Sequence, residues 1–407
     1  MCTLELFVNF DKKLSCMNFI LFDGPRRNHL LPFTFTRPVA EIRVGIMTLR
    51  ERWDAFLKVT TSSLTEDYLG VKFPIHLEDV NVFIDASVLP TVELVKAVHS
   101  LRKGEKLMSN ELVVAYSSDE PKSSEEINEF NIIEFTGDFL QIKNTWDIFD
   151  KNAEILQSDF DFITKGRTSQ PISKTNHLIH PERIFLEEGA KVEFSILNAT
   201  DGPIYLGKDS EIWEGSLIRG GLALCEHAIV KMGGKLYGAN TIGPYSKVCG
   251  EISNSVIFGY SSKGHEGYLG NAVLGEWCNI GADSNNSNLK NNYAKVRLWD
   301  YATERFEQTG LQFCGLMMGD HSKTAINTMF NTGTVIGVNS NIYVPGFPRN
   351  FIPSFSWGGA SGFTAYLPEK AFEAAKVMMA RRGVVFDDVE ADILTHVFEI
   401  TKKWRKY

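Results

Sequence analysis

Residues 19–41 contain the residue types from which proteins build phosphate sites. They read FILFDGPRRNHLLPFTFTRPVAE, an apolar run followed by a glycine, two adjacent arginines and irregular chain. Gly24 would let the backbone approach a phosphate closely, and Arg26 or Arg27 would supply positive charge and paired donors. The same residues could also form a polar loop at the end of a sheet strand. The elements around this stretch must decide between the two interpretations.

Length and composition define the class of protein. A chain of 407 residues exceeds what one hydrophobic core usually serves, so we expect more than one domain. With 43% hydrophobic and 23% charged residues, the composition is that of a folded globular protein. A net charge of -8 without a Lys/Arg stripe disfavours a nucleic-acid partner. No apolar run approaches the roughly 18 residues that span a bilayer, so we expect no membrane partner and favour small-molecule substrates.

The cysteines and the first residues indicate the compartment. Six cysteines are spread along the chain without a CxxC pair, which argues against a zinc site and a disulfide framework. We therefore expect reduced thiols and a cytoplasmic location. Residues 1–16, MCTLELFVNFDKKLSC, contain acidic residues and no continuous apolar core, so they make a poor signal peptide. We interpret them as an N-terminal extension or as an artefact of the start site.

Residues 17–165 alternate between predicted strands and helices. Residues 18–22 and 80–86 are short apolar runs bounded by turn residues, as expected for parallel strands buried on both faces. Residues 90–105 predict a helix that begins near Pro90 and ends at Gly104. Residues 146–156 are expected to close this α/β domain.

An internal repeat begins after Pro203. Every sixth residue is aliphatic at eight consecutive positions: Leu206, Ile212, Ile218, Leu224, Val230, Leu236, Ile242 and Val248. Six is the period of the hexapeptide β-helix, in which each hexad forms one short strand and one tight turn and its aliphatic side chain points into a triangular prism. The phase returns at residues 274, 280, 336 and 342. We predict a left-handed parallel β-helix over residues 201–353, preceded by a linker and first coil over residues 166–200.

Two regions depart from this repeat. Residues 285–312 break the period and are predicted to form a loop outside the prism, and loops of that length are often functional. Residues 354–407 have helical periodicity instead, with one helix from Pro368 to near Gly383 and a second over residues 389–404. We expect these helices to cap the open end of the prism or to pack on a neighbouring subunit.

Residues 264–290, GHEGYLGNAVLGEWCNIGADSNNSNLK, connect the repeat with chemistry. They resemble the acetyltransferase core of the bifunctional sugar-1-phosphate nucleotidyltransferase/acetyltransferases, which include the glucosamine-1-phosphate acetyltransferase/uridylyltransferase family. The pattern is a histidine, a tyrosine three residues later, two LG pairs, an NIGA sequence and an asparagine-containing loop. The matching residues are His265, Tyr268, Asn279 and Asn288, and residues 315–337 continue the likeness.

The resemblance implies a role for each of these residues. His265 would be the general base that takes a proton from the sugar amine as it attacks the thioester of acetyl-CoA, a task for which the near-neutral pKa of imidazole is suited. Tyr268, Asn279 and Asn288 would hold the sugar and orient the base. A structural interpretation of these four residues stays open, because a histidine can be a satisfied polar residue at a coil corner, Tyr and Asn suit β-helix turns, and an asparagine-rich run such as that around Asn288 can be an ordinary loop.

One position departs from the family. The lysine that contacts the sugar phosphate in these enzymes aligns with Ser253, and Lys263 could substitute for it. The identity of the phosphosugar is therefore open. His321 lies in a GDH turn and is interpreted as a structural residue or as one close to CoA.

The opening stretch fits the same resemblance. These enzymes begin with a nucleotidyltransferase domain whose first strand runs into a glycine-rich loop with an arginine, and a PK-containing segment follows. Here the usual GxG is DGP and the lysine is absent, with Arg37 nearby. Asp85, in FIDASVLP, stands where the family binds magnesium. Together with WDIF and GFPRNFIPSFSWGG, these features resemble the bacterial GlmU-like family, in a form with a shortened N-terminal domain.

The resemblance implies two transfer reactions in one homotrimer. Acetyl would pass from acetyl-CoA to an amino-sugar 1-phosphate, and uridylyl would pass from UTP with Mg²⁺, so that glucosamine 1-phosphate becomes UDP-N-acetylglucosamine. The nucleotide would contact Gly24, Arg26, Arg27 and Arg37. Two alternatives stay open: acetyl transfer alone, with a sugar-nucleotide-binding N-terminal domain that does not catalyse, or a regulatory or assembly subunit without catalysis.

Overall fold

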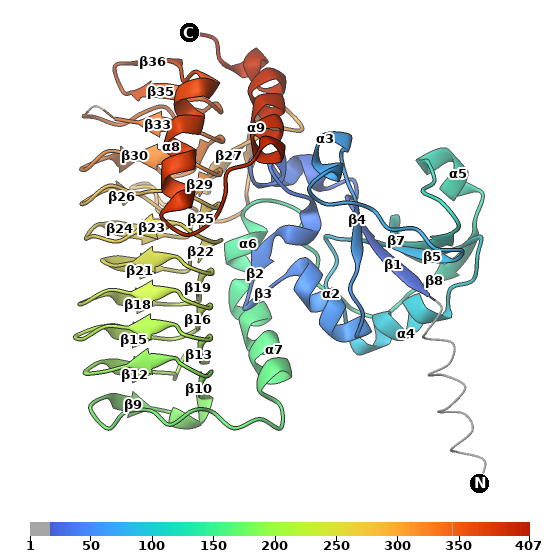
Figure 1. Cartoon of the computed structure of the whole chain (residues 1–407), viewed down its shortest axis with the longest axis horizontal. Coiled ribbons are helices and arrows are strands. Elements are labelled where there is room, and N and C mark those ends of the chain that lie inside the picture. Colours follow the sequence, from blue (N-terminus) through green and yellow to red (C-terminus); the bar gives the residue numbers. More distant parts are fainter. Residues whose placement is uncertain (1–16, 344) are drawn as a thin grey trace. The chain divides into compact units, whose positions relative to one another are not determined.

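The computed structural model describes residues 17–343 and 345–407, so the predicted extension over residues 1–16 lies outside the described residues. The described chain forms two compact units. The first contains residues 17–27, Arg37–Ile42 and Thr48–Lys143, and the second contains Asn28–Thr36, Arg43–Met47 and Asn144–Tyr407. Figure 1 shows the sheet and helices of the first unit in blue to green, and the stacked strands of the second in green to red.

The first unit is built on a mixed sheet of six strands in the order β4-β1-β5-β7-β6-β8. The predicted strands are present, and β1 runs parallel to both β4 and β5. The strands are β1 (Asn18–Phe22), β4 (Ser62–Leu64), β5 (Asn81–Asp85), β6 (Glu105–Ser109), β7 (Leu112–Ser118) and β8 (Asn131–Glu134). Since β1 and β5 are parallel neighbours, the residues that follow them lie at one edge of the sheet.

The helices of this unit are short. They are α2 (Leu49–Leu57), α3 (Asp67–Gly70), α4 (Val92–Ser100) and α5 (Ser124–Asn128). The Thr91 side chain accepts a hydrogen bond from the backbone N–H of Leu94, and Leu101 is extended, so α4 is shorter than the predicted helix over residues 90–105.

The second unit is a parallel β-helix with three faces, as predicted (Figure 1). The first face is a continuous sheet of β10 (Ile184–Leu186), β13 (Ile204–Leu206), β16 (Leu222–Leu224), β19 (Asn240–Ile242), β22 (Val256–Ile257), β25 (Val273–Leu274), β29 (Leu316–Met318), β32 (Thr334–Ile336) and β34 (Phe351–Ile352). The second face contains β11 (Lys191–Val192), β14 (Glu211–Ile212), β17 (Ile229–Val230), β20 (Lys247–Val248) and β23 (Ser262–Lys263), and further on β30 (Lys323–Thr324), β33 (Asn341–Ile342), β35 (Ser356–Gly359) and β36 (Gly362–Ala365). The third face contains β9 (His177–Ile179), β12 (Ile196–Asn198), β15 (Leu217–Arg219), β18 (Lys235–Tyr237), β21 (Glu251–Ser253) and β24 (Tyr268–Gly270), and further on β26 (Asn285–Asn286) and β31 (Met329–Phe330).

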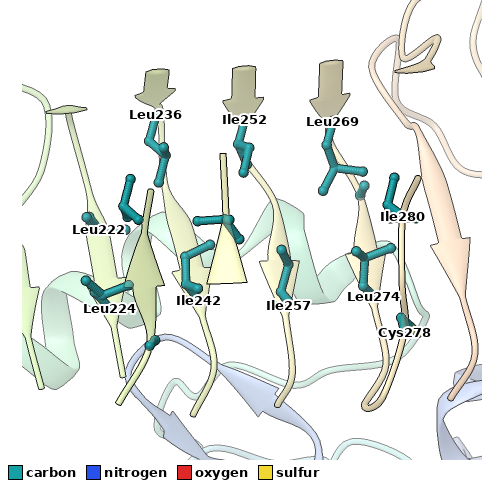
Figure 2. Packing of buried hydrophobic residues seen from close by; sticks show 14 of the residues in the cluster. Leu222, Leu224, Leu236, Ile242, Ile252, Ile257, Leu269, Leu274, Cys278 and Ile280 are labelled. Atoms are coloured by element: carbon teal, nitrogen blue, oxygen red, sulfur yellow. The ribbon is translucent and has the colours of Figure 1, made fainter. Parts of the chain in front are cut away.

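The interior of the β-helix is the predicted aliphatic ladder. All eight residues of the period-six series are at most 2% exposed. Leu224, Ile242, Ile257 and Leu274 are direct partners on consecutive strands of the first face, and Figure 2 shows these side chains stacked between the faces. Each coil therefore buries the apolar side chains of its neighbours, which is what stabilises a repeat that could not fold alone.

One corner of the β-helix is an aromatic ladder. Five residues on successive coils have left-handed backbones with φ between 54° and 60°: His227, Tyr245, Tyr260, Trp277 and His321. Their rings stack with centroid separations of 4.7, 5.1, 4.2 and 6.2 Å in that order. Ring stacking offsets the backbone strain of a non-glycine residue in this region. His321, buried at 4% exposure, therefore has a structural role in this ladder.

The predicted excursion is present but begins after residue 286, because Asn285 and Asn286 form β26 on the third face and pair with β31. The chain departs after β26 and rejoins the first face at β29. The excursion contains an antiparallel hairpin of β27 (Arg297–Asp300) and β28 (Arg305–Gln308), which the sequence pattern did not predict.

Segments from the N-terminal half belong to the β-helix unit. The helices α6 (Asp147–Asp150) and α7 (Asn152–Thr164) do so, and Leu156 and Phe160 of α7 pack against Tyr205 and Ala223. Residues 28–36, the irregular chain after the two arginines, also pack there. Phe33 contacts Phe258 at a ring separation of 5.3 Å, so this segment is held by the β-helix rather than forming a longer phosphate loop.

The C-terminal helices α8 (Pro368–Ala380) and α9 (Asp388–Ile400) do not cap the prism. They run alongside it, and the hairpin of β35 and β36 ends the stack (Figure 1). Arg381 and Arg382, which follow α8, help to lower the pKa of Lys247 on β20, several coils from the end of the stack, although burial is the main cause. None of the helices in the described ranges is long and apolar enough to cross a membrane.

Candidate active sites

In the first unit, the candidate site is centred on Asp85, the last residue of β5. Its side chain is fully buried. One carboxylate oxygen accepts hydrogen bonds from the backbone N–H and the hydroxyl of Ser87, at 2.9 and 2.7 Å, whereas Oδ2 has no hydrogen-bond partner among the residues that the structure describes. Burial raises the pKa of Asp85 to about 6. A buried acceptor without a donor fits a site that a cation occupies.

The loop after β1 passes directly against this carboxylate. A Cβ atom at Gly24 would lie 2.3 Å from Oδ2 of Asp85, so a side chain there would displace it. The adjacent Asp23 accepts hydrogen bonds from the backbone N–H of Val39 at 2.7 Å and from Thr65 at 2.6 Å. Burial raises the pKa of Asp23 as well. Two carboxylates and the half-buried backbone of Gly24 therefore meet at the carboxyl ends of parallel strands.

The three arginines predicted to bind nucleotide differ in their surroundings. Arg27 is 9% exposed, and its guanidinium contacts Asp23 at 3.2 Å, Glu66 at 3.4 Å and the hydroxyl of Tyr68 at 3.0 Å, so it is held in place by this unit. Arg37 is also buried. Arg26 is half-buried, and its charge partly opposes the rise that burial causes in the pKa of Asp85. Arg26 is therefore the arginine best placed to meet a phosphate.

The residues around Asp85 fit a magnesium ion that is bound partly by the protein and partly by substrate phosphates. No group of three or more His, Cys, Asp or Glu side chains converges among the described residues. Mg²⁺ is usually held by one or two carboxylates, with phosphate oxygens and water completing its octahedron. Asp85 would supply one such ligand through Oδ2, and Asp23 lies close enough to raise its pKa.

In the β-helix, the candidate catalytic residue His265 lies on the turn between β23 and β24. His265 is exposed, while Lys263, two residues earlier, is only 1% exposed. The Lys263 ammonium donates to the backbone oxygens of Cys249 at 3.1 Å, His265 at 2.7 Å and Glu266 at 3.2 Å. Burial lowers the pKa of Lys263 to about 8. Its ammonium thus points inward, which does not favour the predicted contact with a substrate phosphate.

Two of the predicted sugar-binding residues meet in one cavity. The Asn288 amide donates to the Tyr268 hydroxyl at 2.9 Å and to the Asn271 side chain at 2.8 Å. Burial raises the pKa of Tyr268, so its hydroxyl stays protonated. The cavity has a volume of about 780 Å³, within the range of small-ligand sites. It is lined by Asp150, Tyr237, Ser253, Asn254, Tyr268, Asn271, Asn288, Leu289, Lys295, Gly310, Leu311, Gln312 and Phe313.

The cavity includes residues that the sequence did not single out. Ser253, which aligns with the family lysine, lines it, and Lys295 from the excursion after β26 supplies a cation. Lys295 was missed because its segment breaks the repeat. Asn279, in contrast, does not line this cavity. It is exposed on the second face, where its backbone bridges Ser262 and Lys323.

Comparisons with known proteins agree with this arrangement. Residues 19–168 match the family described as Sugar nucleotidyl transferase. The chain has a sugar nucleotidyl transferase domain. The bifunctional protein GlmU of Methanocaldococcus jannaschii is 30% identical over 89 residues, which are 22% of this chain and 21% of that protein. The match thus spans about a fifth of the relative. This domain, a β-helix and a distant GlmU relative together confirm the predicted GlmU-like character.

The nucleotidyl transferase domain contains the whole of the first candidate site. Gly24, Arg26 and Asp85 all lie within residues 19–168. The matched region ends close to the end of α7, and the β-helix with His265 and the Tyr268 cavity follows it.

Proposed function

We propose that the chain acetylates an amino-sugar 1-phosphate on its β-helix and couples the product to a nucleotide on its sugar nucleotidyl transferase domain. The best-supported reaction sequence converts glucosamine 1-phosphate, acetyl-CoA and UTP into UDP-N-acetylglucosamine, CoA and pyrophosphate. The proposal rests on one observation: this domain is followed in the same chain by a β-helix that carries the exposed His265 and the hydrogen-bonded pair of Tyr268 and Asn288. His265 precedes Tyr268 by three residues in the sequence.

Acetyl transfer requires a base at the attacking amine. The sugar nitrogen attacks the thioester carbonyl, His265 takes the proton that the nitrogen loses, and the sulfur leaves as the CoA thiol. The exposed imidazole of His265 lies on a turn whose backbone is held by Lys263, where a bound amine could approach it. The hydroxyl of Tyr268 and the amide of Asn288 would orient the sugar, and Lys295 would face its phosphate.

A homotrimer would complete this site. The outer side of the third face exposes a group of apolar side chains to water, and such groups often mark a protein interface. They are Ile179, Ile196, Leu217 and Tyr237, at 39 to 48% exposure. Tyr237 also lines the Tyr268 cavity. A neighbouring β-helix packed on this face would bury both the apolar stripe and the approach to the cavity. The cysteines within the described residues, Cys225, Cys249, Cys278 and Cys314, are buried and form no disulfide with one another, which fits the cytoplasmic location we propose.

Nucleotidyl transfer would occur at the edge of the first sheet. The phosphate oxygen of the acetylated sugar attacks the α-phosphorus of UTP, and pyrophosphate leaves. Gly24 gives the phosphates access to backbone, and Arg26 offsets their charge. Mg²⁺ bound at Asp85 would neutralise charge on the phosphates.

One observation favours an alternative for the first unit. Arg27 is engaged by Asp23, Glu66 and Tyr68, and the family lysine is absent, so fewer cations are available for a triphosphate than the resemblance implies. In the alternative, this unit binds a sugar nucleotide without transferring it.

Two assays on the purified protein separate these functions. We expect thiol release from acetyl-CoA with glucosamine 1-phosphate, and pyrophosphate release from UTP with N-acetylglucosamine 1-phosphate. Thiol release alone would favour the alternative. Silence in both assays, with each substrate at millimolar concentration, would contradict the proposal and favour a regulatory or assembly subunit.

A further inference from the structure

A second cavity in the β-helix unit shares no lining residue with the Tyr268 cavity. Its volume is about 590 Å³, which is sufficient for a nucleotide-sized ligand. It is lined by Lys290, Arg297, Phe306, Thr332, Arg349, Asn350, Phe351, Pro353 and Trp404. These residues come from the excursion after β26, the turn between β31 and β32, the segment around β34 and the C-terminus.

The lining is positively charged in a chain whose net charge is -8. It contains three cations and no Asp or Glu. Within the described ranges, no carboxylate lies within ion-pair distance of Arg297 or Arg349, and Lys290 donates only to the backbone oxygen of Lys295, at 3.1 Å. Three cations that converge without a counter-ion repel one another, so the cavity favours an anion.

The rest of the lining is aromatic. Phe351 stacks on Trp299 at a ring separation of 4.2 Å, and Phe306 meets the same indole edge-on at 5.6 Å, so both rings are held in place. Trp404 contributes a third ring, and its indole N–H has no hydrogen-bond partner in the described part of the chain. Fixed aromatic faces bind planar rings by stacking, and the indole N–H offers them a donor.

We propose that this cavity binds a nucleoside diphosphate group, with Lys290, Arg297 and Arg349 on the phosphates and the aromatic rings against the base. Cations alone would fit any anion, and aromatic rings alone would fit any apolar ligand. Their combination in one cavity fits a ligand that has both a diphosphate and a planar ring. The binding proposal rests on the lining of this cavity and holds whether or not either transfer reaction takes place. The group could belong to a free nucleotide or to a larger cosubstrate that contains one.

The test is calorimetric titration of the full-length protein with ADP, in EDTA to suppress metal-dependent binding at the first unit. We expect saturable binding that weakens at least tenfold in Arg297→Ala and in Arg349→Ala. The matched control is Arg305→Ala, because Arg305 lies on the same hairpin but pairs with Glu307 outside the cavity. Its affinity should stay within about twofold of wild type. Equal losses in all three variants, or no binding by the wild type, would overturn the proposal.

Two further ligands test each half of the recognition. Adenosine and inorganic pyrophosphate should each bind more weakly than ADP; pyrophosphate binding as tight as that of ADP would reduce the cavity to a simple anion site and contradict the role of the rings. Competition between ADP and CoA then shows which kind of molecule supplies the nucleoside diphosphate group. CoA that displaces ADP assigns the cavity to the diphosphate end of the cosubstrate, whereas ADP binding unaffected by CoA assigns it to a free nucleotide.

Discussion

The ammonium of Lys263 lies 2.7 Å from the backbone oxygen of His265 and thereby ties the exposed turn of the histidine to the interior of the β-helix. Lys263 occupies the position that Val248 holds on the preceding strand of the second face. The hydrocarbon part of the Lys263 side chain therefore packs in the apolar ladder, and its ammonium donates hydrogen bonds to the backbone oxygens of Cys249, His265 and Glu266.

Replacing Lys263 should affect acetyl transfer without affecting nucleotidyl transfer. In Lys263→Met the stem is kept, but the turn loses its two hydrogen bonds, at His265 and Glu266, and the bond to Cys249 on the preceding coil is also lost. Because small displacements of a general base are costly, we expect kcat for thiol release to fall by about tenfold or more, with little change in KM for acetyl-CoA. Lys235→Met is the control, since Lys235 reaches the same turn through an exposed ion pair with Glu266 at 3.0 Å. If both variants lose the same activity, Lys263 has no specific role in positioning His265.

The low pKa of Lys263 predicts how its contribution to stability changes with pH. Its pKa is about 8 in the fold and 10.5 when exposed, so between these values the unfolded chain binds more protons and the free energy of unfolding rises with pH. Relative to Lys263→Met, the wild type should gain about 2 kcal/mol between pH 7 and pH 10. Urea denaturation of both proteins at the two pH values measures this. A difference that stays constant would show that Lys263 is not desolvated.

Substitution of Gly24 should slow nucleotidyl transfer selectively. In Gly24→Ala the new methyl group would meet Oδ2 of Asp85 at 2.3 Å and displace either the loop or the carboxylate. We expect pyrophosphate release to fall by about tenfold or more, while thiol release is retained. Gly70→Ala is the control in the same unit, because a Cβ at Gly70 meets no atom within 4 Å. Pyrophosphate release that survives in Gly24→Ala would place the phosphates elsewhere.

The sequence predicted the periodic parts of the molecule better than the irregular ones. The ladder from Leu206 to Val248 could be predicted because every coil needs an aliphatic side chain at the same position. Lys263 was predicted to face the substrate, although it stands six residues before Leu269 and so keeps the inward phase. This six-residue spacing could have predicted that the Lys263 side chain points into the β-helix. The hairpin with Arg297 and the cavity residue Lys295 have no period from which their contacts could be predicted.

The apolar third face predicts an oligomer. Leu217 is 48% exposed there, and Leu217→Glu would bury a charge at any interface that covers this face. We expect sedimentation to show a trimer for the wild type and a smaller species for the variant, with loss of thiol release but not of pyrophosphate release. Val71→Glu introduces the same charge at a residue of the first unit that is 74% exposed and should leave the trimer intact. A Leu217→Glu variant that remains trimeric would exclude this face as the interface.

The most direct test of the account is thiol release from acetyl-CoA with glucosamine 1-phosphate in His265→Ala, with pyrophosphate release measured on the same sample. We predict that thiol release falls by at least two orders of magnitude, as expected for loss of a general base, while pyrophosphate release is unchanged. The unchanged second activity would show that the variant is folded. Thiol release at the wild-type rate in His265→Ala would contradict the assignment of His265 as the base and with it the proposed chemistry of the β-helix.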